Sequence, residues 1–304
     1  MMEQVHLSSC PICKSKQVKY SFSVTDHLVS GSQFPLWQCD DCGFVFTQDR
    51  PDDSHLGGYY ASEDYVSHSD TRRGLIASLY HIVRTYMLHN KASLVKKATR
   101  LSEGSLLDIG AGTGYFAHTM KQQGWMVDAI EPEEKARAFA RSKFGLDIHP
   151  NAHLDEFDER SFDVITLWHV LEHISALHEA WQTYRRLLRP GGKLIIAVPN
   201  RLSYDAAHYA GRWAAYDVPR HLWHFAPSDI RRLASLHGFT LDAVRPMPFD
   251  AFYISMLSEK NSGKNCAFLR GFAVGLRAWI SLSSKRVNSS SLIYILTPVE
   301  SPTV

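Results

Sequence analysis

The sequence lacks three features that mark specialised classes of protein. It has no run of about 18 apolar residues and no apolar N-terminal segment, so neither a membrane-spanning helix nor a signal peptide is expected. It has no strong charge bias, because 33 basic and 31 acidic residues leave a net charge of +2, and this disfavours nucleic acid as a partner. Cysteine is scarce, at five of 304 residues. We therefore expect a soluble, cytoplasmic globular protein.

Four of the five cysteines form two Cys-x-x-Cys pairs, Cys10 with Cys13 and Cys39 with Cys42. In a reducing compartment such pairs indicate metal binding rather than disulfides. Each turn presents two thiolates, and two turns close a tetrahedral site with no open position. We predict a structural Zn²⁺ here, with a redox dithiol, or iron in place of zinc, as open alternatives. The fifth cysteine, Cys266, has no partner motif.

The pattern of apolar residues divides the chain into three parts. Residues 1–50 are predicted to form a zinc-ribbon-like module around the four cysteines, which we call the four-cysteine module, and residues 51–101 a linker followed by a long amphipathic helix. Between 102 and 304, predicted strands alternate with helices over short connections, which indicates an α/β fold with a parallel sheet covered on both faces. An insert at 201–226, rich in Tyr, Trp, His and Arg, interrupts this alternation. The main predicted strands are 106–109, 125–130, 162–168 and 193–198.

A glycine-rich turn follows the first of these strands. Asp108 precedes Gly110, Gly112 and Gly114, and glycines let a backbone approach a ligand closely. The third glycine stands one position too early for a dinucleotide-binding loop, and Asp108 would repel a pyrophosphate but suits a cationic ligand. Glu131, at the end of the next strand, can accept hydrogen bonds from two ribose hydroxyls.

Together with FDVITLWHVLEH (162–173) and RLLRPGGKLIIAVPN (186–200), this turn makes the chain similar to class I S-adenosylmethionine-dependent methyltransferases over residues 72–250. The resemblance implies a Rossmann-like, seven-stranded sheet whose last strand is antiparallel, and S-adenosyl-L-methionine as cofactor. The four-cysteine module resembles that of a subset of these enzymes, some associated with sugar or cell-surface biosynthesis. The cofactor site implied by the resemblance consists of Asp108, Gly110, Ala111, Gly112, Gly114, Glu131, Pro132 and Trp168.

Candidate catalytic side chains occur in two places. His169 follows the strand 162–168, and Arg220, His221 and His224 lie in the insert. Methyl transfer to a hydroxyl requires in-line attack and removal of a proton, which a neutral imidazole near pH 7 can accept. Arg220 could bind a phosphate or carboxylate in a bidentate manner. The alternative for all four is a packing or capping role.

Tyr60 and Tyr65 are candidates for a lid over the cofactor, or for simple packing.

An apolar stripe at 268–280, with Arg270 and Arg277, permits peripheral contact with a membrane. Packing of that helix over the sheet edge is the alternative. Nothing in the sequence specifies an oligomeric state.

The function predicted from these features is transfer of a methyl group to a small molecule or glycoconjugate, at oxygen, with a histidine as base. A nucleic-acid methyltransferase that binds RNA through its zinc module is one alternative. The near-neutral charge disfavours it, as does the sequence VPNR at 198–201, which lacks the Asn/Asp-Pro-Pro-aromatic run typical of enzymes that methylate base amines. A non-catalytic, cofactor-binding scaffold is the other.

Overall fold

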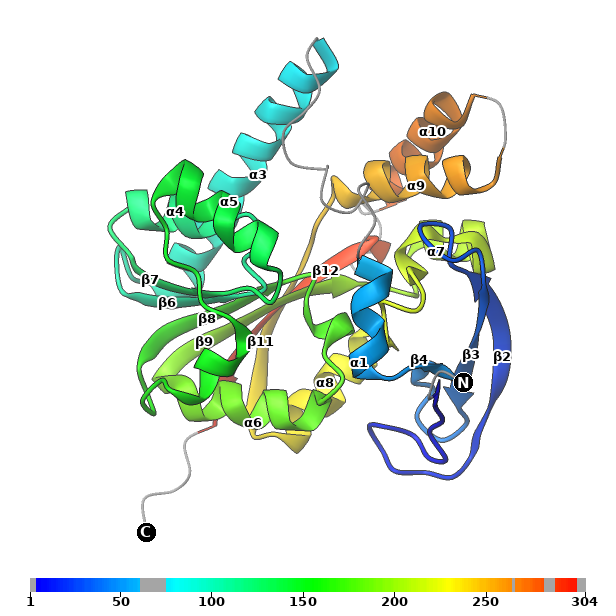
Figure 1. The fold of residues 1–304 in the computed structure, drawn as a ribbon, viewed down its shortest axis with the longest axis horizontal. Coiled ribbons are helices and arrows are strands. Elements are labelled where there is room, and N and C mark those ends of the chain that lie inside the picture. The colour runs from blue at the N-terminus through cyan, green and yellow to red at the C-terminus, as the bar shows by residue number, and fades with distance from the viewer. Residues whose placement is uncertain (1–3, 61–74, 264–265, 282–287, 300–304) are drawn as a thin grey trace.

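The computed structural model describes residues 4–60, 75–263, 266–281 and 288–299, and of residues 75–82 the backbone only. A mixed six-stranded sheet lies between two layers of helices, with a smaller four-stranded sheet beside it (Figure 1). Tyr65 lies outside the described residues. None of the helices in the described ranges is both long enough and apolar enough to cross a membrane.

The large sheet has the strand order β11-β12-β9-β8-β6-β7. The last four of these strands are parallel, whereas β12 runs antiparallel to both of its neighbours, which confirms the expected antiparallel last strand. Among the described residues, a parallel bridge between Ile130 and His149 stands where a seventh strand was expected. The strands are β6 Ser105–Ile109, β7 Met126–Ile130, β8 Phe162–Trp168, β9 Leu188–Pro199, β11 Phe239–Pro246 and β12 Ser291–Pro298.

Helices cover both faces of this sheet, with α4 and α5 on one side and α6 and α8 on the other (Figure 1). In α6, Leu177, Trp181, Tyr184 and Leu187 are all buried at helical spacing and pack towards the sheet. The long helix predicted before the glycine turn is one continuous helix, α3. These helices are α3 Leu75–Thr99, α4 Tyr115–Gln122, α5 Glu134–Phe144, α6 Leu177–Leu187 and α8 Pro227–Leu236.

The second sheet joins the four-cysteine module to the insert. Its strands are β2 Val18–Thr25, β3 Gln33–Cys39, β4 Val45–Thr47 and β10 Trp223–His224. Strand β10 comes from the insert and pairs with β4, with Trp223 opposite Phe46. The side chains of Phe44 and Phe46 share one buried cluster with Trp181 of α6. The module therefore packs on the body of the protein and contributes to its core.

Shorter elements complete the described chain. Strand β1 Gln4–Val5 pairs with β5 Arg50–Pro51. The remaining helices are α1 Asp53–Leu56, α7 Tyr204–Tyr209, α9 Asp250–Asn261 and α10 Ala267–Ser281, and the 3₁₀ turns are Gly57–Tyr60, Asn151–Asp155, Leu171–His173, Ala210–Arg212 and Ala214–Tyr216.

Candidate active site

The glycine loop joins the end of β6 to the start of α4. Gly110, Gly112 and Gly114 have φ angles of 70°, 54° and 80°, in the left-handed region that favours glycine. A β-carbon on Gly110 would lie 2.3 Å from a methyl group of Val170, and one on Gly114 would lie 2.9 Å from Ala140. Around Gly112, in contrast, a β-carbon would meet nothing within 4 Å. The loop is closed at its two ends and open in the middle, where a ligand can approach the backbone.

Glu131, at the end of β7, lies directly beside this loop. The Ala111 N–H donates to the carbonyl of Ile130 at 2.9 Å, which holds the loop against the strand end. The Glu131 carboxylate accepts the N–H of Gly112 at 2.8 Å and that of Glu133 at 2.9 Å. Burial raises the pKa of Glu131, and the two N–H groups oppose that shift. The carboxylate is thus oriented, with acceptor positions left for a ligand.

Asp108 lies near the end of β6, with only 1% of the residue exposed. The hydroxyl of Thr166 donates to its carboxylate at 2.7 Å. Burial raises the pKa of Asp108 to about 7, against the opposing effects of Thr166 and of the Lys91 ammonium group. Burial also lowers the pKa of Lys91, which the charges of Asp250 and Asp108 partly offset. A cationic ligand bound here would favour the ionised form of Asp108.

Trp168 is the last residue of β8, and Pro132 lies two residues beyond the end of β7. The Trp168 ring packs edge-on against Phe116, with centroids 5.3 Å apart, and the Lys91 ammonium lies 4.4 Å from the Trp168 ring centre. The buried indole N–H has no hydrogen-bond partner among the described residues, so it is a donor available to a ligand. Pro132 is exposed, and its carbonyl accepts from Arg137 at 2.6 Å.

His169 lies between two carboxylates. Its Nε2 is 3.1 Å from Oδ2 of Asp250, and its Nδ1 is 3.5 Å from Oε1 of Glu172. Burial alone would lower the pKa of His169, but the hydrogen bond with Asp250 and the nearby Glu172 carboxylate outweigh this effect and raise it to about 9. This raised pKa favours the protonated, hydrogen-bond-donating form of the ring, whereas the proton acceptor expected from the sequence is a neutral imidazole.

Glu172, His173 and His221 form a second cluster, which we call the Glu172 triad. One ligand atom from each lies within 4.8 Å of the others. Glu172 is fully buried, and neither of its carboxylate oxygens has a hydrogen-bond partner among the described residues. The Nδ1–H of His173 donates to the Arg220 carbonyl at 3.0 Å, and that of His221 to the Ala215 carbonyl at 2.8 Å.

These two hydrogen bonds set the chemistry of the triad. Since a carbonyl accepts the proton on Nδ1, the lone pair of the neutral form of each ring lies on Nε2. Burial, followed by the charge of His221, lowers the pKa of His173 to about 4. The triad thus gathers a carboxylate and two imidazoles, a set of groups that can accept a proton or hold a divalent cation. Tyr60 borders it, with its hydroxyl 3.0 Å from Nδ1 of His173.

Arg220 is engaged in ion pairs inside the protein. Its guanidinium, 1% exposed, lies 3.0 Å from Asp26 and 2.6 Å from Asp217, and it donates to the Tyr59 carbonyl at 3.1 Å. Burial would lower the pKa of Arg220, but the two aspartates outweigh this and raise it. Since Asp26 belongs to the four-cysteine module and Asp217 to the insert, the guanidinium joins these two parts.

His224 lies in β10, where the insert meets the module. Its Nε2 is 3.0 Å from the hydroxyl of Thr47, which itself donates to the His221 carbonyl at 2.7 Å. Burial, followed by the charge of His221, holds the pKa of His224 well below its usual range. Of the three predicted insert residues, only His221 belongs to the triad, and His224 contacts the module.

The four paired cysteines converge as their spacing predicts. The Sγ atoms of Cys10 and Cys42 are 3.6 Å apart, those of Cys13 and Cys39 are 3.5 Å apart, and all four lie within 4.8 Å of one another. A tetrahedral ion with bonds of about 2.3 Å to sulfur needs sulfurs about 3.8 Å apart. The set therefore fits Zn²⁺. Cys266 is exposed and not part of it.

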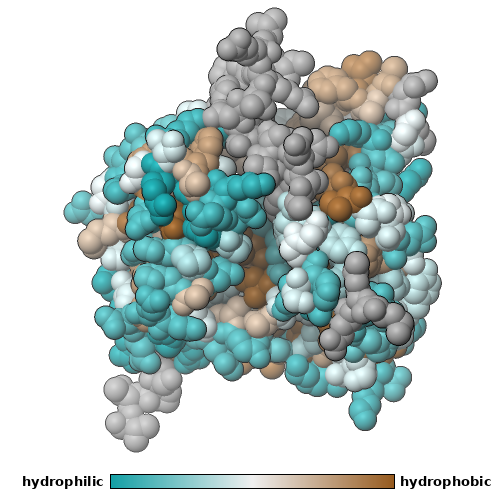
Figure 2. Space-filling view, in the orientation of Figure 1, coloured by the Kyte–Doolittle hydropathy of each residue, from teal (hydrophilic) through white to brown (hydrophobic). Residues whose placement is uncertain are grey.

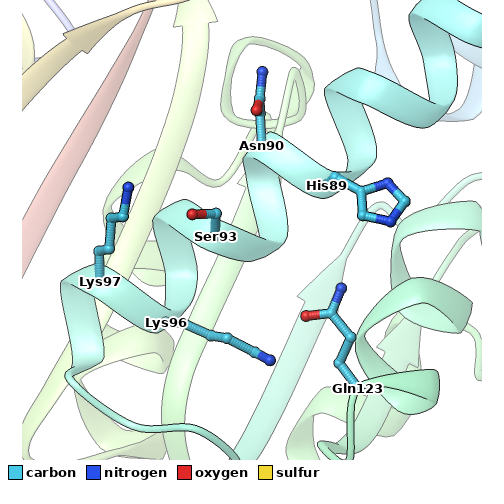
Figure 3. A pocket seen from close by; sticks show the side chains of 6 residues that line it. All are labelled: His89, Asn90, Ser93, Lys96, Lys97 and Gln123. Atoms are coloured by element: carbon cyan, nitrogen blue, oxygen red, sulfur yellow. The ribbon is translucent and has the colours of Figure 1, made fainter.

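A shallow groove of about 550 Å³ lies elsewhere, along α3 (Figure 3). None of the predicted cofactor or catalytic residues lines it, so it is separate from the candidate active site. Its lining is His89, Asn90, Ser93, Lys96, Lys97 and Gln123.

The structure adds side chains to the site that the sequence did not single out. Asp250 and Lys91 come from the first turn of α9 and from α3, far from the glycine loop in sequence. Glu172 and His173 lie in the run FDVITLWHVLEH but were not among the candidate catalytic residues, and they form the triad with His221. The one signal that could have identified them is their position directly after β8, at the carboxyl edge of a parallel sheet.

Comparison with known proteins assigns a family to the part of the chain that contains the glycine loop and the Glu172 triad. A family model described as "Methyltransferase domain" matches residues 80–244, which is more than half of the chain. The ubiquinone biosynthesis O-methyltransferase of Maricaulis maris is 32% identical over 175 residues, which cover 53% of this chain and 67% of that protein. The enzyme of the same name from Caulobacter vibrioides is 34% identical over 122 residues, covering 36% of this chain and 48% of that protein.

Among solved structures, a putative sarcosine dimethylglycine methyltransferase from Galdieria sulphuraria superposes with a TM-score of 0.49 at 16% identity. The superposition covers 71% of this chain and 86% of that one.

Proposed function

The chain belongs to the methyltransferase-domain family and is a class I S-adenosylmethionine-dependent methyltransferase, and on this premise we propose that it methylates a hydroxyl oxygen of a small molecule or glycoconjugate. The observation that carries this proposal is the Glu172 triad, three proton acceptors in one buried cluster next to His169. A hydroxyl must lose its proton as its oxygen attacks the methyl group, and the triad can accept it. The relatives named as O-methyltransferases support the same reaction type.

The cofactor is proposed to lie across the open middle of the glycine loop. Asp108 is placed next to the positively charged methionine part of the cofactor. That charge would stabilise the ionised form of the Asp108 carboxylate, whose pKa burial raises. Glu131 accepts the ribose hydroxyls with the acceptor positions that its two N–H bonds leave open. The Lys91 ammonium, close to both Asp108 and Trp168, suits the cofactor's carboxylate. When bound, the cofactor supplies the electrophilic methyl group.

The proton acceptor is proposed to be His173 or His221 rather than His169. Their Nε2 atoms carry lone pairs, and the Glu172 carboxylate between them stabilises the imidazolium that forms. His169 is already protonated at neutral pH, so it donates a hydrogen bond instead. His224 and Arg220 act indirectly, since both connect the insert to the four-cysteine module.

The four-cysteine site is proposed to hold a structural Zn²⁺. The three-part organisation that we propose is the module at 1–50, the linker and helix at 51–101, and the methyltransferase domain at 102–304. The insert at 201–226 pairs with the module through β10, so the metal stabilises the part of the chain that positions His221.

Calorimetric titration with S-adenosylhomocysteine tests the cofactor site. We expect micromolar binding by the wild type and a loss of about tenfold or more in Glu131→Gln, because the variant removes a charged acceptor. The matched control is Glu134→Gln, an exposed carboxylate three residues away, which should bind normally. Failure of folded, metal-loaded wild type to bind would reject the proposal.

A transfer assay with methyl-labelled cofactor tests the acceptor chemistry, with phenols and sugars as candidate acceptors. Glu172→Gln should keep cofactor binding but lower kcat by about 10²-fold, the usual contribution of acid–base catalysis. His208→Gln, an exposed histidine, should leave kcat unchanged. Label in RNA rather than in small acceptors would support the nucleic-acid alternative, and binding without any transfer would support a scaffold.

A further inference from the structure

Helices α9 and α10 form a hairpin that stands out from the body of the protein (Figure 1). The two backbones pack unusually closely, because a β-carbon on Gly271 would lie 2.5 Å from Cα of Met256, and one on Gly275 would lie 2.8 Å from Cα of Phe252. The inner side of α10 is thus built from small residues. Most of its large apolar side chains lie outside this contact, although the ring of Phe272 also packs against that of Phe252 of α9, with centroids 5.3 Å apart.

These large side chains face outwards instead. The residues and their exposed fractions are Phe268 67%, Leu269 68%, Phe272 48%, Leu276 38% and Trp279 47%. Figure 2 shows the resulting apolar surface at the upper right of the molecule, over α10. In α6, by contrast, Trp181 and Leu187 are fully buried. A surface helix normally buries its large apolar residues, so a contiguous apolar face of this kind marks an interaction surface.

The segment of sequence that contains this face carries basic charges only. The sequence from 260 to 299 contains no acidic residue and six basic ones: Lys260, Lys264, Arg270, Arg277, Lys285 and Arg286. The structure describes three of these residues, Lys260, Arg270 and Arg277, and all three are exposed. Arg270 also lies 3.5 Å from Glu259 of α9. Two copies of this face would bring like charges together around a twofold axis, which disfavours self-association. An anionic surface complements it.

We propose that the outer face of α10 docks on the surface of an anionic lipid bilayer. Phe268, Leu269, Phe272, Leu276 and Trp279 enter the boundary between headgroups and acyl chains, and the basic side chains contact the headgroups. This docking is independent of the proposed methyl transfer. The hairpin is connected to the candidate active site, because α9 begins at Asp250, which bonds His169.

Flotation of the full chain with lipid vesicles tests the proposal. We expect binding to vesicles of phosphatidylcholine mixed with phosphatidylglycerol, and much weaker binding to phosphatidylcholine alone. Raising the salt from ~0.05 M to ~0.5 M should release the protein in part, because screening weakens the electrostatic contribution. Equal binding to both kinds of vesicle, or to neither, would overturn the proposal.

Two sets of substitutions separate the apolar and basic contributions. The triple variant Phe268→Ser, Leu269→Ser and Trp279→Ser should lose vesicle binding by about tenfold or more, because it removes the largest inserted apolar area. Lys260→Gln with Arg277→Gln should weaken binding to the anionic vesicles only. The matched control is Met126→Ser with Leu236→Ser, at positions 66% and 56% exposed outside the hairpin, which should bind as the wild type does.

Unchanged cofactor binding and circular dichroism show that the triple variant is folded. Unchanged flotation of this folded variant would contradict the proposal. So would a wild-type dimer that the triple variant dissociates while neither protein floats with vesicles, since a second copy would then cover the face.

Discussion

His169 and Asp250 are 81 residues apart in the chain, yet Nε2 of the histidine lies 3.1 Å from Oδ2 of the aspartate. His169 follows the central strand β8, and Asp250 begins the hairpin of α9 and α10. Burial opposes charge on both groups, but their mutual hydrogen bond outweighs it, so that the pKa of Asp250 is lowered and that of His169 is raised to about 9. The pair ties the hairpin to the candidate active site.

We expect this pair to give a characteristic pH dependence of stability. A raised histidine pKa contributes stability that is complete below the unfolded value of ~6.5 and is lost as the pH rises through about 9. The lowered pKa of Asp250 contributes above ~3.8 and is lost on acidification. Asp250→Asn should therefore cost about 1.5–3 kcal/mol near pH 6 and less above pH ~9, measured by urea unfolding.

The control for this experiment is Asp147→Asn, which removes an exposed carboxylate paired with Arg141. Its effect should stay within about 0.5 kcal/mol at both pH values. A constant difference between wild type and Asp250→Asn from pH ~6 to ~10 would contradict the assignment of His169 as a cation.

Removal of the Arg220 side chain should destabilise the protein strongly. Arg220→Met leaves the buried carboxylate of Asp26 without its cationic partner, and such a loss costs about 3–5 kcal/mol. Because the guanidinium joins the module to the insert, the variant should also be cleaved faster by protease within 201–226. Arg212→Met, an exposed position in the same insert, should change the free energy of unfolding by no more than about 0.5 kcal/mol.

Loss of one cysteine ligand should release the metal and loosen the insert. Cys39→Ser should lower the zinc content, measured by plasma mass spectrometry, and lower Tm, because β10 pairs with β4 immediately after the second cysteine pair. Cys266→Ser should keep both unchanged, since that thiol is exposed and outside the cluster. Full zinc content in Cys39→Ser would show that the cluster is not the metal site.

Gly110→Ala should weaken cofactor binding by more than the strain of its left-handed backbone conformation alone explains. Gly110 and Gly191 have similar φ angles, 70° and 74°, so alanine at either costs about 1–2 kcal/mol of backbone strain. Only at Gly110 would the new methyl group collide with Val170, at 2.3 Å. We expect Gly110→Ala to abolish binding of S-adenosylhomocysteine and Gly191→Ala to retain it. Equal affinity in the two variants would argue against a cofactor over this loop.

Features confined to a short segment could be predicted from the sequence. The glycine loop and the Cys-x-x-Cys turns depend on backbone geometry within a few residues, so their spacing alone indicated the turn and the cluster. The strands of the large sheet were likewise indicated by their apolar runs, since β6 and most of β9 are buried on both faces. Strand β3 was not predicted, because Pro35 within it weakens a strand signal.

What the sequence determined by itself was the type of fold, the candidate cofactor loop and the cysteine cluster, because local chemistry specifies each of them. The tertiary structure alone decided the charge state of His169, the burial of Arg220 and the assembly of the Glu172 triad. These properties depend on side chains brought together from distant segments, such as Asp250 and His221, and a pKa responds to the final neighbours and the burial of a group. No spacing rule contains that information.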